Sequence, residues 1–123
     1  MKIALLLIVL TFVISCKGRD ENISYASHVR QVDSIVYANK DLQSLEGVLA
    51  EFEANRDDVG RMVAMRELGK IYREASNFKT ALSYHEKALL LAKELKDTAN
   101  IIRILNQLGT DFRRLGVLHE AAV

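Results

Sequence analysis

The sequence predicts an all-α fold built from antiparallel helical hairpins, and three observations support this prediction. There is no proline among the 123 residues, and the chain after residue 16 is rich in Ala, Leu, Glu, Lys and Arg, which are strong helix formers. Over most of that part, apolar residues recur at steps of three and four, as on one face of an α-helix. The sequence also repeats itself at an offset of forty residues.

Residues 1–15 are predicted to be an export signal rather than part of the fold. Lys2 is followed by an almost unbroken apolar run from Ile3 to Ile14, as in secretory signals. At about 1.5 Å per residue such a run extends about 18 Å, which is well short of the roughly 30 Å hydrocarbon layer of a bilayer. A short uncleaved anchor is the alternative to a signal.

The only cysteine, Cys16, ends this run in the tetrapeptide Val13-Ile14-Ser15-Cys16, which resembles the lipobox of bacterial lipoproteins. The resemblance implies cleavage before Cys16 and attachment of a diacylglycerol to its thiol; the alternative is an ordinary cysteine of a signal sequence. It further implies a lipid-anchored protein of the bacterial cell envelope, facing the periplasm or the cell surface, since two or more acyl chains anchor stably. Residues 16–23 are polar and suit a flexible tether.

Composition and motifs argue against several classes of function. Without Lys2 the chain carries as many basic as acidic residues, so nothing indicates nucleic acid as a partner. There is no phosphate loop, no His-x-x-x-His pair and no glycine-flanked serine, so we expect neither catalysis nor a cofactor. His85 and His119 could meet between hairpins and bind a metal, but packing in the fold or a solvated edge is the favoured interpretation, and no metal site is predicted.

Residues 24–55 are interpreted as a degenerate first hairpin. Asp41 is a plausible N-cap between its two helices, and residues 55–58 are expected to form the loop that follows. The apolar residues with helical spacing are Val29, Val32, Val36, Leu42, Leu45, Leu49 and Phe52.

The repeat becomes clear from residue 59 onward. Glycine inside a helix costs about 1 kcal/mol relative to alanine, so the recurrence of Gly69 at Gly109 predicts close approach by a neighbouring helix at both places. The other matching pairs are Met65 with Leu105, Leu68 with Leu108, Tyr72 with Phe112, Arg73 with Arg113, Phe78 with Leu118 and Ala81 with Ala121.

Each repeated unit is predicted to be a helical hairpin. In residues 59–97, Ser76 and Asn77 separate the two helices, with Asn77 expected to tolerate the left-handed conformation. Gly116 is expected to make the same turn in residues 98–123, which leaves an incomplete unit whose second helix is cut short. A helix of under two turns is marginal by itself, so we expect this end to fray or to self-associate.

These units resemble the tetratricopeptide repeat, whose signature has a large residue, Leu-Gly, Tyr and Ala at fixed spacing. Met65-x-x-Leu68-Gly69-x-x-Tyr72 with Ala81 fits, and the second unit fits at the equivalent residues. Two residues depart from the family pattern, because His85 stands where phenylalanine is preferred and Lys93 where proline is frequent. The period of forty exceeds the usual thirty-four or so and is similar to that of longer-helix variants.

The resemblance implies a right-handed superhelix of hairpins, a TPR-like α-solenoid, with an incomplete C-terminal repeat and with Tyr72 and Phe112 in the core. It also implies a concave groove lined by one face of each first helix. Guanidinium groups bind carboxylates in bidentate fashion, so this face is expected to bind acidic peptide; a solvated basic face is the alternative. The residues at groove positions are Arg66, Lys70, Arg73, Arg103, Asn106 and Arg113.

The function predicted from the sequence is a membrane-tethered, non-catalytic module that holds a protein or acidic peptide in its concave face. The alternative is the periplasmic sensory part of a bacterial signalling or transcription regulator, of which this chain would be a truncated product.

Overall fold

The structure is a computed structural model that describes residues 24–122. The chain divides into two compact units, Met1–Gln31 and Val32–Val123. Of the first unit only residues 24–31 are described, and they are helical. The predictions for residues 1–15, for Cys16 and for the tether of residues 16–23 lie outside the described residues. Between residues 24 and 122 all regular structure is helical, which confirms the predicted all-α class.

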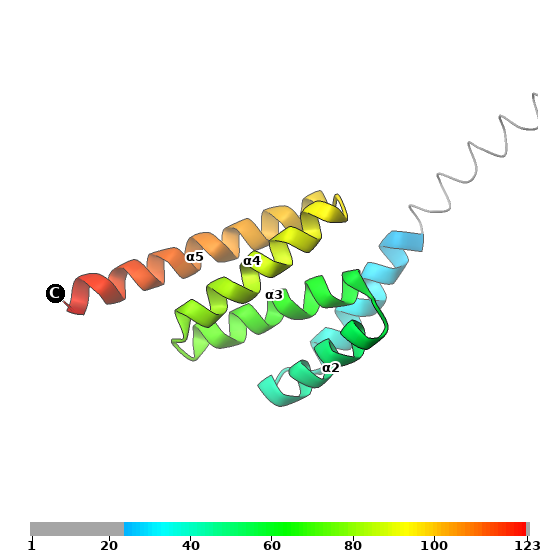
Figure 1. Ribbon diagram of the computed structural model, residues 1–123, viewed down its shortest axis with the longest axis horizontal. Coiled ribbons are helices and arrows are strands. Elements are labelled where there is room, and N and C mark those ends of the chain that lie inside the picture. The colour runs from blue at the N-terminus through cyan, green and yellow to red at the C-terminus, as the bar shows by residue number, and fades with distance from the viewer. Residues whose placement is uncertain (1–23, 123) are drawn as a thin grey trace, which may run out of the picture. The chain divides into compact units, whose positions relative to one another are not determined.

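The second unit begins with residues 32–38, which are helical, and continues with four further helices. In Figure 1, α3 and α4 lie side by side in opposite directions, and α5 runs alongside α4. Contacts are most extensive between α3 and α4, then between α4 and α5, then between α2 and α3. This is the predicted stack of antiparallel hairpins. The helices are α2 (Leu42–Ala54), α3 (Asp58–Glu74), α4 (Phe78–Glu94) and α5 (Thr98–Ala122).

The three turns that join α2 to α5 are built alike. In each, one residue adopts the left-handed conformation, with φ of 54° at Arg56, 62° at Ser76 and 55° at Lys96. The residue that follows is Asp or Asn, and its side chain caps the next helix; Asp57, for example, accepts a hydrogen bond from the backbone N–H of Gly60 at 2.9 Å. Capping by a side-chain oxygen satisfies an N–H that has no partner inside the helix.

The second of these turns corrects one prediction. The left-handed residue is Ser76 and not Asn77, whose φ is −94°. Asn77 is the N-cap of α4, and its side chain accepts a hydrogen bond from the N–H of Thr80 at 3.3 Å. Because an N-cap residue needs a backbone outside the helical region with negative φ, Asn77 cannot also supply the left-handed step. The predicted cap at Asp41 is confirmed, since it accepts from the N–H of Ser44 at 2.8 Å.

The core is centred on the α3–α4 pair. Gly69 allows α4 to approach α3, because a Cβ at that position would stand 2.7 Å from Cε1 of the buried His85 ring and closer still to Nε2 and Cδ2. The predicted close approach is therefore confirmed at Gly69. At Gly109 the prediction is wrong, since among the described residues no atom other than the adjacent backbone of α5 lies within 4 Å of the Cβ position. The buried apolar side chains of this pair include Met62, Val63, Met65, Leu68, Phe78, Ala81, Ala88 and Ala92.

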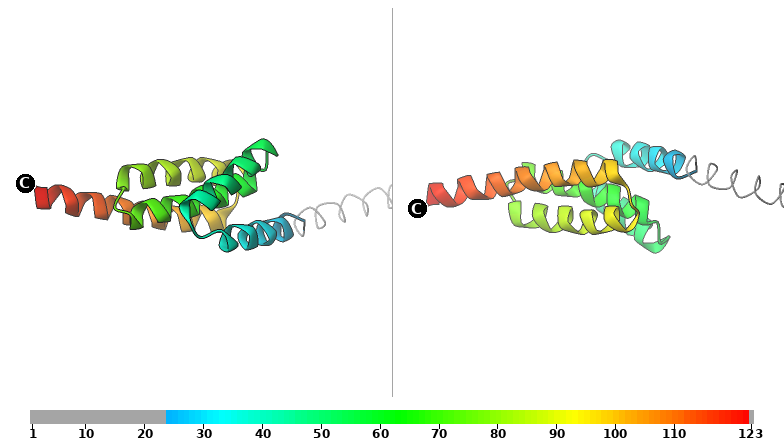
Figure 2. Two further views of the ribbon diagram at one scale, coloured as in Figure 1. Left: turned by 90° about the horizontal axis from the view of Figure 1, so that it is seen from below. Right: turned by 90° about the horizontal axis from the view of Figure 1, so that it is seen from above.

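The last helix departs most from expectation. α5 runs without a break through Gly116 to Ala122 (Figure 2), and no described glycine has positive φ, so the predicted turn at Gly116 is wrong. The other turns need a left-handed residue followed by Asp or Asn, whereas Val117 follows Gly116. A glycine within a helix costs only about 1 kcal/mol, so the helix continues.

Because α5 does not fold back, one side of it has no helix to cover it among the described residues. Phe112 is 56% exposed and Leu105 50% exposed. The prediction that Phe112 lies in the core is therefore wrong. Its counterpart Tyr72 is half-buried, where it stacks on Tyr84 with ring centroids 5.5 Å apart.

Candidate functional site

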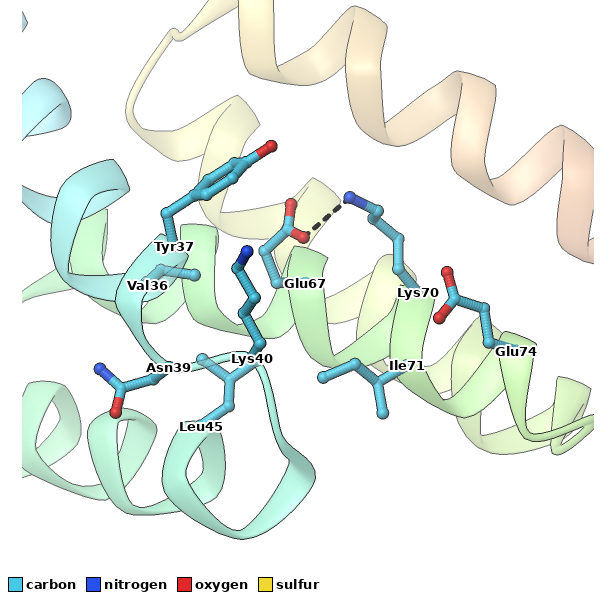
Figure 3. A pocket seen from close by; sticks show the side chains of 9 residues that line it. All are labelled: Val36, Tyr37, Asn39, Lys40, Leu45, Glu67, Lys70, Ile71 and Glu74. Atoms are coloured by element: carbon cyan, nitrogen blue, oxygen red, sulfur yellow. Dashed lines mark hydrogen bonds and ion pairs between the residues drawn. The ribbon is translucent and has the colours of Figure 1, made fainter.

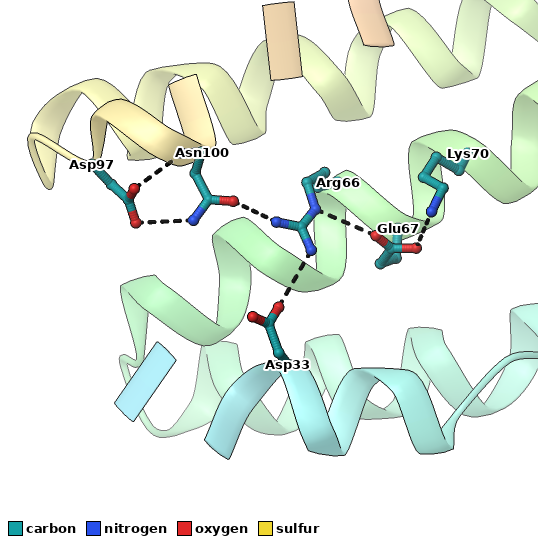
Figure 4. A network of polar contacts seen from close by, with 6 residues as sticks. All are labelled: Asp33, Arg66, Glu67, Lys70, Asp97 and Asn100. Carbon is teal, nitrogen blue, oxygen red and sulfur yellow. Dashed lines mark hydrogen bonds and ion pairs between the residues drawn. The ribbon is translucent and has the colours of Figure 1, made fainter. Parts of the chain in front are cut away.

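Arg66, in the middle of α3, is a buried junction between three helices. Its side chain donates to Asp33 Oδ1 at 3.3 Å, to Glu67 Oε1 at 3.3 Å and to the side-chain oxygen of Asn100 (Figure 4). Asp33 belongs to the helix of residues 32–38 and Asn100 to the first turn of α5. Arg66 is only 8% exposed, so its charge is compensated within the fold.

Asn100 is itself held in place from the turn before α5. Its side-chain N–H donates to Asp97 Oδ2 at 2.9 Å, which turns the amide oxygen toward Arg66. At the other end of the network, Glu67 accepts from Lys70 Nζ at 2.8 Å. A buried charge that loses its partners is costly, so this network fixes the position of α5 relative to α3.

A second buried network links α3, α4 and α5 through Asp111, which is fully buried. One carboxylate oxygen accepts from Arg73 Nη1 at 3.1 Å and the other contacts Nδ1 of His85. The second ring nitrogen of His85 lies 3.1 Å from the backbone oxygen of Arg66. Of the two interpretations favoured for His85, packing in the fold is confirmed and a solvated edge is wrong, since the ring is fully buried. The guanidinium of Arg73 is thus paired with Asp111 inside the fold, as that of Arg66 is paired with its own partners.

Next to the Arg66 network lies a pocket of about 290 Å³ that we call the polar pocket. It receives side chains from the helix of residues 32–38, from α3 and from α5, which are the first helices of the successive hairpins. Four of the six predicted groove residues meet here, namely Arg66, Lys70, Arg103 and Asn106. The complete lining is Tyr37, Arg66, Glu67, Lys70, Arg103, Asn106 and Gln107.

The other two predicted residues do not reach the polar pocket. Arg73 pairs with Asp111. Arg113 folds back on α5, where it donates to the backbone oxygen of Gly109 at 3.4 Å and to Thr110 Oγ1 at 3.2 Å. It lines a separate hollow with Thr110, Arg114 and Val117. The six residues are therefore not one continuous row.

Within the polar pocket, Arg103 is the cation free to bind a ligand. Its side chain is exposed and makes no hydrogen bond or ion pair with any of residues 24–122, whereas Arg66 and Lys70 are both paired with Glu67. The side-chain amides of Asn106 and Gln107 stand beside it and carry both donors and acceptors. This combination can bind a carboxylate through the guanidinium and a peptide backbone through the amides.

Three lining residues were missed by sequence reasoning. Glu67 and Gln107 directly follow Arg66 and Asn106. The repeat pattern assigns groove positions to Arg66 and Asn106 but not to the residues that follow them. Tyr37 is 73% exposed at the end of its helix. The signal that could have found it is an aromatic residue directly after Val36, off the apolar face of a predicted helix.

The aromatic pair Tyr72 and Tyr84 does not line the polar pocket. The hydroxyl of Tyr72 donates to Glu46 Oε1 at 3.0 Å, and this hydrogen bond to a carboxylate raises the pKa of Tyr72 above its ordinary value. Burial raises the pKa of Tyr84. With the rings stacked on each other at 12°, the pair joins α3 to α4.

Comparison with known proteins agrees with the repeat seen in the fold. A family model of the tetratricopeptide repeat matches residues 60–122, just over half of the chain. The match covers α3, α4 and α5 but not Tyr37 or the rest of the first hairpin. No curated protein and no solved structure matches the chain. None of the helices in the described part is both long and apolar enough to cross a bilayer.

Proposed function

Because this chain belongs to the tetratricopeptide repeat family, whose members generally mediate protein–protein interaction, we propose that it is a non-catalytic module that binds a partner protein through an acidic segment. The binding site is the polar pocket, and Arg103 is the residue that contacts the carboxylate. Asn106 and Gln107 hold the peptide backbone beside it.

The observation that carries this proposal is the contrast between Arg103 and the cations near it, Arg66, Lys70 and Arg73. Arg66 and Arg73 are held by buried acidic or amide partners, and Lys70 is bound to Glu67. Arg103 alone among the cations of the polar pocket has no such partner in the described residues. Hydrogen bonds to charged groups contribute about 1.5–3 kcal/mol, so one bidentate contact supports a modest affinity that added salt weakens.

The test compares two arginines of α5. Fluorescent peptides that contain an aspartate–glutamate pair are titrated against the purified full chain, with asparagine–glutamine peptides for comparison. We expect Arg103→Gln to weaken binding of the acidic peptides about tenfold, which is the loss of roughly 1.4 kcal/mol. Arg114→Gln, an exposed residue outside the polar pocket, is the matched control and should leave binding unchanged. Equal binding of acidic and amide peptides by the wild-type chain would refute the proposal.

We further propose that the module is tethered to a membrane of the bacterial cell envelope through lipidated Cys16. The support is the lipobox-like tetrapeptide at the end of the apolar run. Labelled palmitate should be incorporated by the wild-type chain and not by Cys16→Ser. Equal labelling of both forms, or a mature protein that still starts at Met1, is the result that speaks against the tether.

Self-association through α5 is also proposed, with a second copy of the chain as the occupant of its uncovered face. We call this face the α5 stripe; its residues are Ile102, Leu105, Gly109, Phe112 and Gly116. Its three large side chains are at least half exposed. Three of the equivalent residues forty positions earlier, Met62, Met65 and Gly69, are buried on α3, which packs against α4. The same face of a first helix is therefore covered by a second helix in the preceding repeat.

A further inference from the structure

A second pocket adjoins the polar pocket and shares Tyr37, Glu67 and Lys70 with it. Its volume is about 220 Å³, and it lies between the end of the first helix, the turn before α2, the start of α2, and α3. We call it the apolar socket. Figure 3 shows the side chains that line it: Val36, Tyr37, Asn39, Lys40, Leu45, Glu67, Lys70, Ile71 and Glu74.

The floor of the apolar socket is aliphatic. Val36 and Leu45 approach the space from one side and Ile71 from the other (Figure 3). Val36 and Leu45 are buried in the core of the second unit and Ile71 is half-buried on α3. An apolar cavity of about 150 Å³ is enough to hold a benzene molecule. The socket therefore has room for one leucine, methionine or phenylalanine side chain.

The charges at the mouth of the apolar socket balance one another. Lys70 Nζ lies 2.8 Å from Glu67 Oε2, and Lys40 Nζ lies 5.7 Å from the centre of the Tyr37 ring. With Glu74 as the fourth charged residue, there are two positive and two negative groups. The mouth has no charge preference of its own, so the aliphatic floor decides what binds in the socket.

Tyr37 belongs to the lining of both pockets. Its side chain is largely exposed, so the ring is available to a ligand that reaches either pocket. An extended peptide can pass over the ring with one side chain on each side of it, because successive side chains of an extended chain point in alternate directions about 3.3 Å apart along the chain.

We propose that the partner segment carries a bulky apolar side chain a few residues from its carboxylate, and that the apolar socket binds this side chain while Arg103 binds the carboxylate. This inference rests on the proposed function of the polar pocket and adds the chemistry of the second contact. Much of the apolar socket comes from residues 36–45, which the family match does not include. The selectivity thus depends on the first hairpin together with α3, and not on the repeat that the family shares alone.

The first test uses the unaltered full chain and fluorescent peptides with an aspartate–glutamate pair. Leucine, phenylalanine or alanine stands one to four residues before the pair. Burying a large aliphatic or aromatic side chain strengthens binding substantially, so the best leucine or phenylalanine peptide should bind at least about tenfold more tightly than its alanine counterpart. A peptide with leucine and an asparagine–glutamine pair measures the socket without the carboxylate.

Variants then assign the effect to the socket. Ile71→Ala removes part of its floor and should reduce the leucine-over-alanine preference at least threefold or so. Leu89→Ala, at a half-buried residue of α4 outside both pockets, is the matched control and should keep the preference. Helical content measured by circular dichroism shows whether each variant is folded. If Ile71→Ala does not fold, the comparison of leucine, phenylalanine and alanine peptides on the wild-type chain still tests the proposal.

The outcomes separate this inference from the proposed function. If leucine, phenylalanine and alanine peptides bind the wild-type chain equally while Arg103→Gln weakens all of them, the apolar socket does not bind the partner and the polar pocket does. If no acidic peptide binds the wild-type chain, both proposals are overturned. If Leu89→Ala reduces the leucine-over-alanine preference as much as Ile71→Ala does, the assignment of this preference to the apolar socket is also overturned.

Discussion

Gly69 and Gly109 are equivalent residues of the repeat with different surroundings. A methyl group at Gly69 would collide with His85, which is fully buried and held by Asp111 and by the backbone of Arg66. At Gly109 the same methyl group would enter open space. The same substitution at the two residues should therefore have opposite effects.

We expect Gly69→Ala to destabilise the fold by about 1–3 kcal/mol, because an overfilled core must move its neighbours. Gly109→Ala should stabilise it by about 0.5–1 kcal/mol, since alanine is favoured over glycine in a helix. Urea denaturation at low protein concentration measures both, and each variant is the control for the other. A loss of stability in both variants would contradict the surroundings described for Gly109.

The arginines show what sequence alone could predict of the site. Arg66 and Arg103 are the same residue type at neighbouring groove positions, and both were predicted to bind peptide. Arg66 is instead buried with Asp33 and Asn100, residues of two other helices, 33 and 34 positions away in the chain. Spacing along one helix reports which face a side chain lies on, but not which partners the neighbouring helices bring to it.

At the scale of the helices, one of the N-caps could be predicted from the sequence. The cap at Asp41 follows from its place between two apolar patterns, because its side chain needs only the N–H groups of the next turn. The false turn at Gly116 shows the limit of this reasoning. Glycine can either continue or end a helix, and the choice depends on a capping residue after it and on a second helix to pack against. The sequence after Gly116 lacks such a cap.

The cap of α2 should respond to pH. Hydrogen bonds from the side chain and then the backbone N–H of Ser44 lower the pKa of Asp41 below its ordinary value. A lowered carboxyl pKa in the folded state stabilises the cap above the unfolded-state pKa, and this contribution is lost as pH falls through the folded-state value. We therefore expect the start of α2 to loosen only in acid, below about pH 4.

NMR Cα chemical shifts of residues 42–45, followed from pH 6 to pH 2, measure this loosening. Asp41→Asn is the matched control, because asparagine keeps an acceptor oxygen for Ser44 but does not titrate. Its shifts should stay flat where those of the wild-type chain move. Equal pH dependence in the two forms would assign the change to another carboxylate.

For the molecule as a whole, the uncovered face of α5 is the feature that bears on the oligomeric state of the chain. The α5 stripe steps by three and four residues from Ile102 to Gly116, which is the spacing of a coiled-coil seam. Beside a second, antiparallel α5, one register sets Leu105 opposite Gly116 and Phe112 opposite Gly109. In both layers a large side chain faces a glycine that has open space beside it. Large and small residues that alternate in this way allow two facing helices to interdigitate.

We therefore expect a weak, two-fold symmetric dimer, since a single helix pair is small beside the roughly 1,200–2,000 Å² of stable interfaces. Sedimentation equilibrium of the full chain should give a mass that rises from one chain toward two between about 5 and 500 μM. Phe112→Glu places a charge in two symmetry-related layers and should hold the chain as a monomer over that range. Leu90→Glu is the control, because Leu90 is equally exposed on α4 but lies outside the stripe. A wild-type monomer at every concentration, or a dimer that Leu90→Glu disrupts as strongly as Phe112→Glu does, would show that α5 is not the contact.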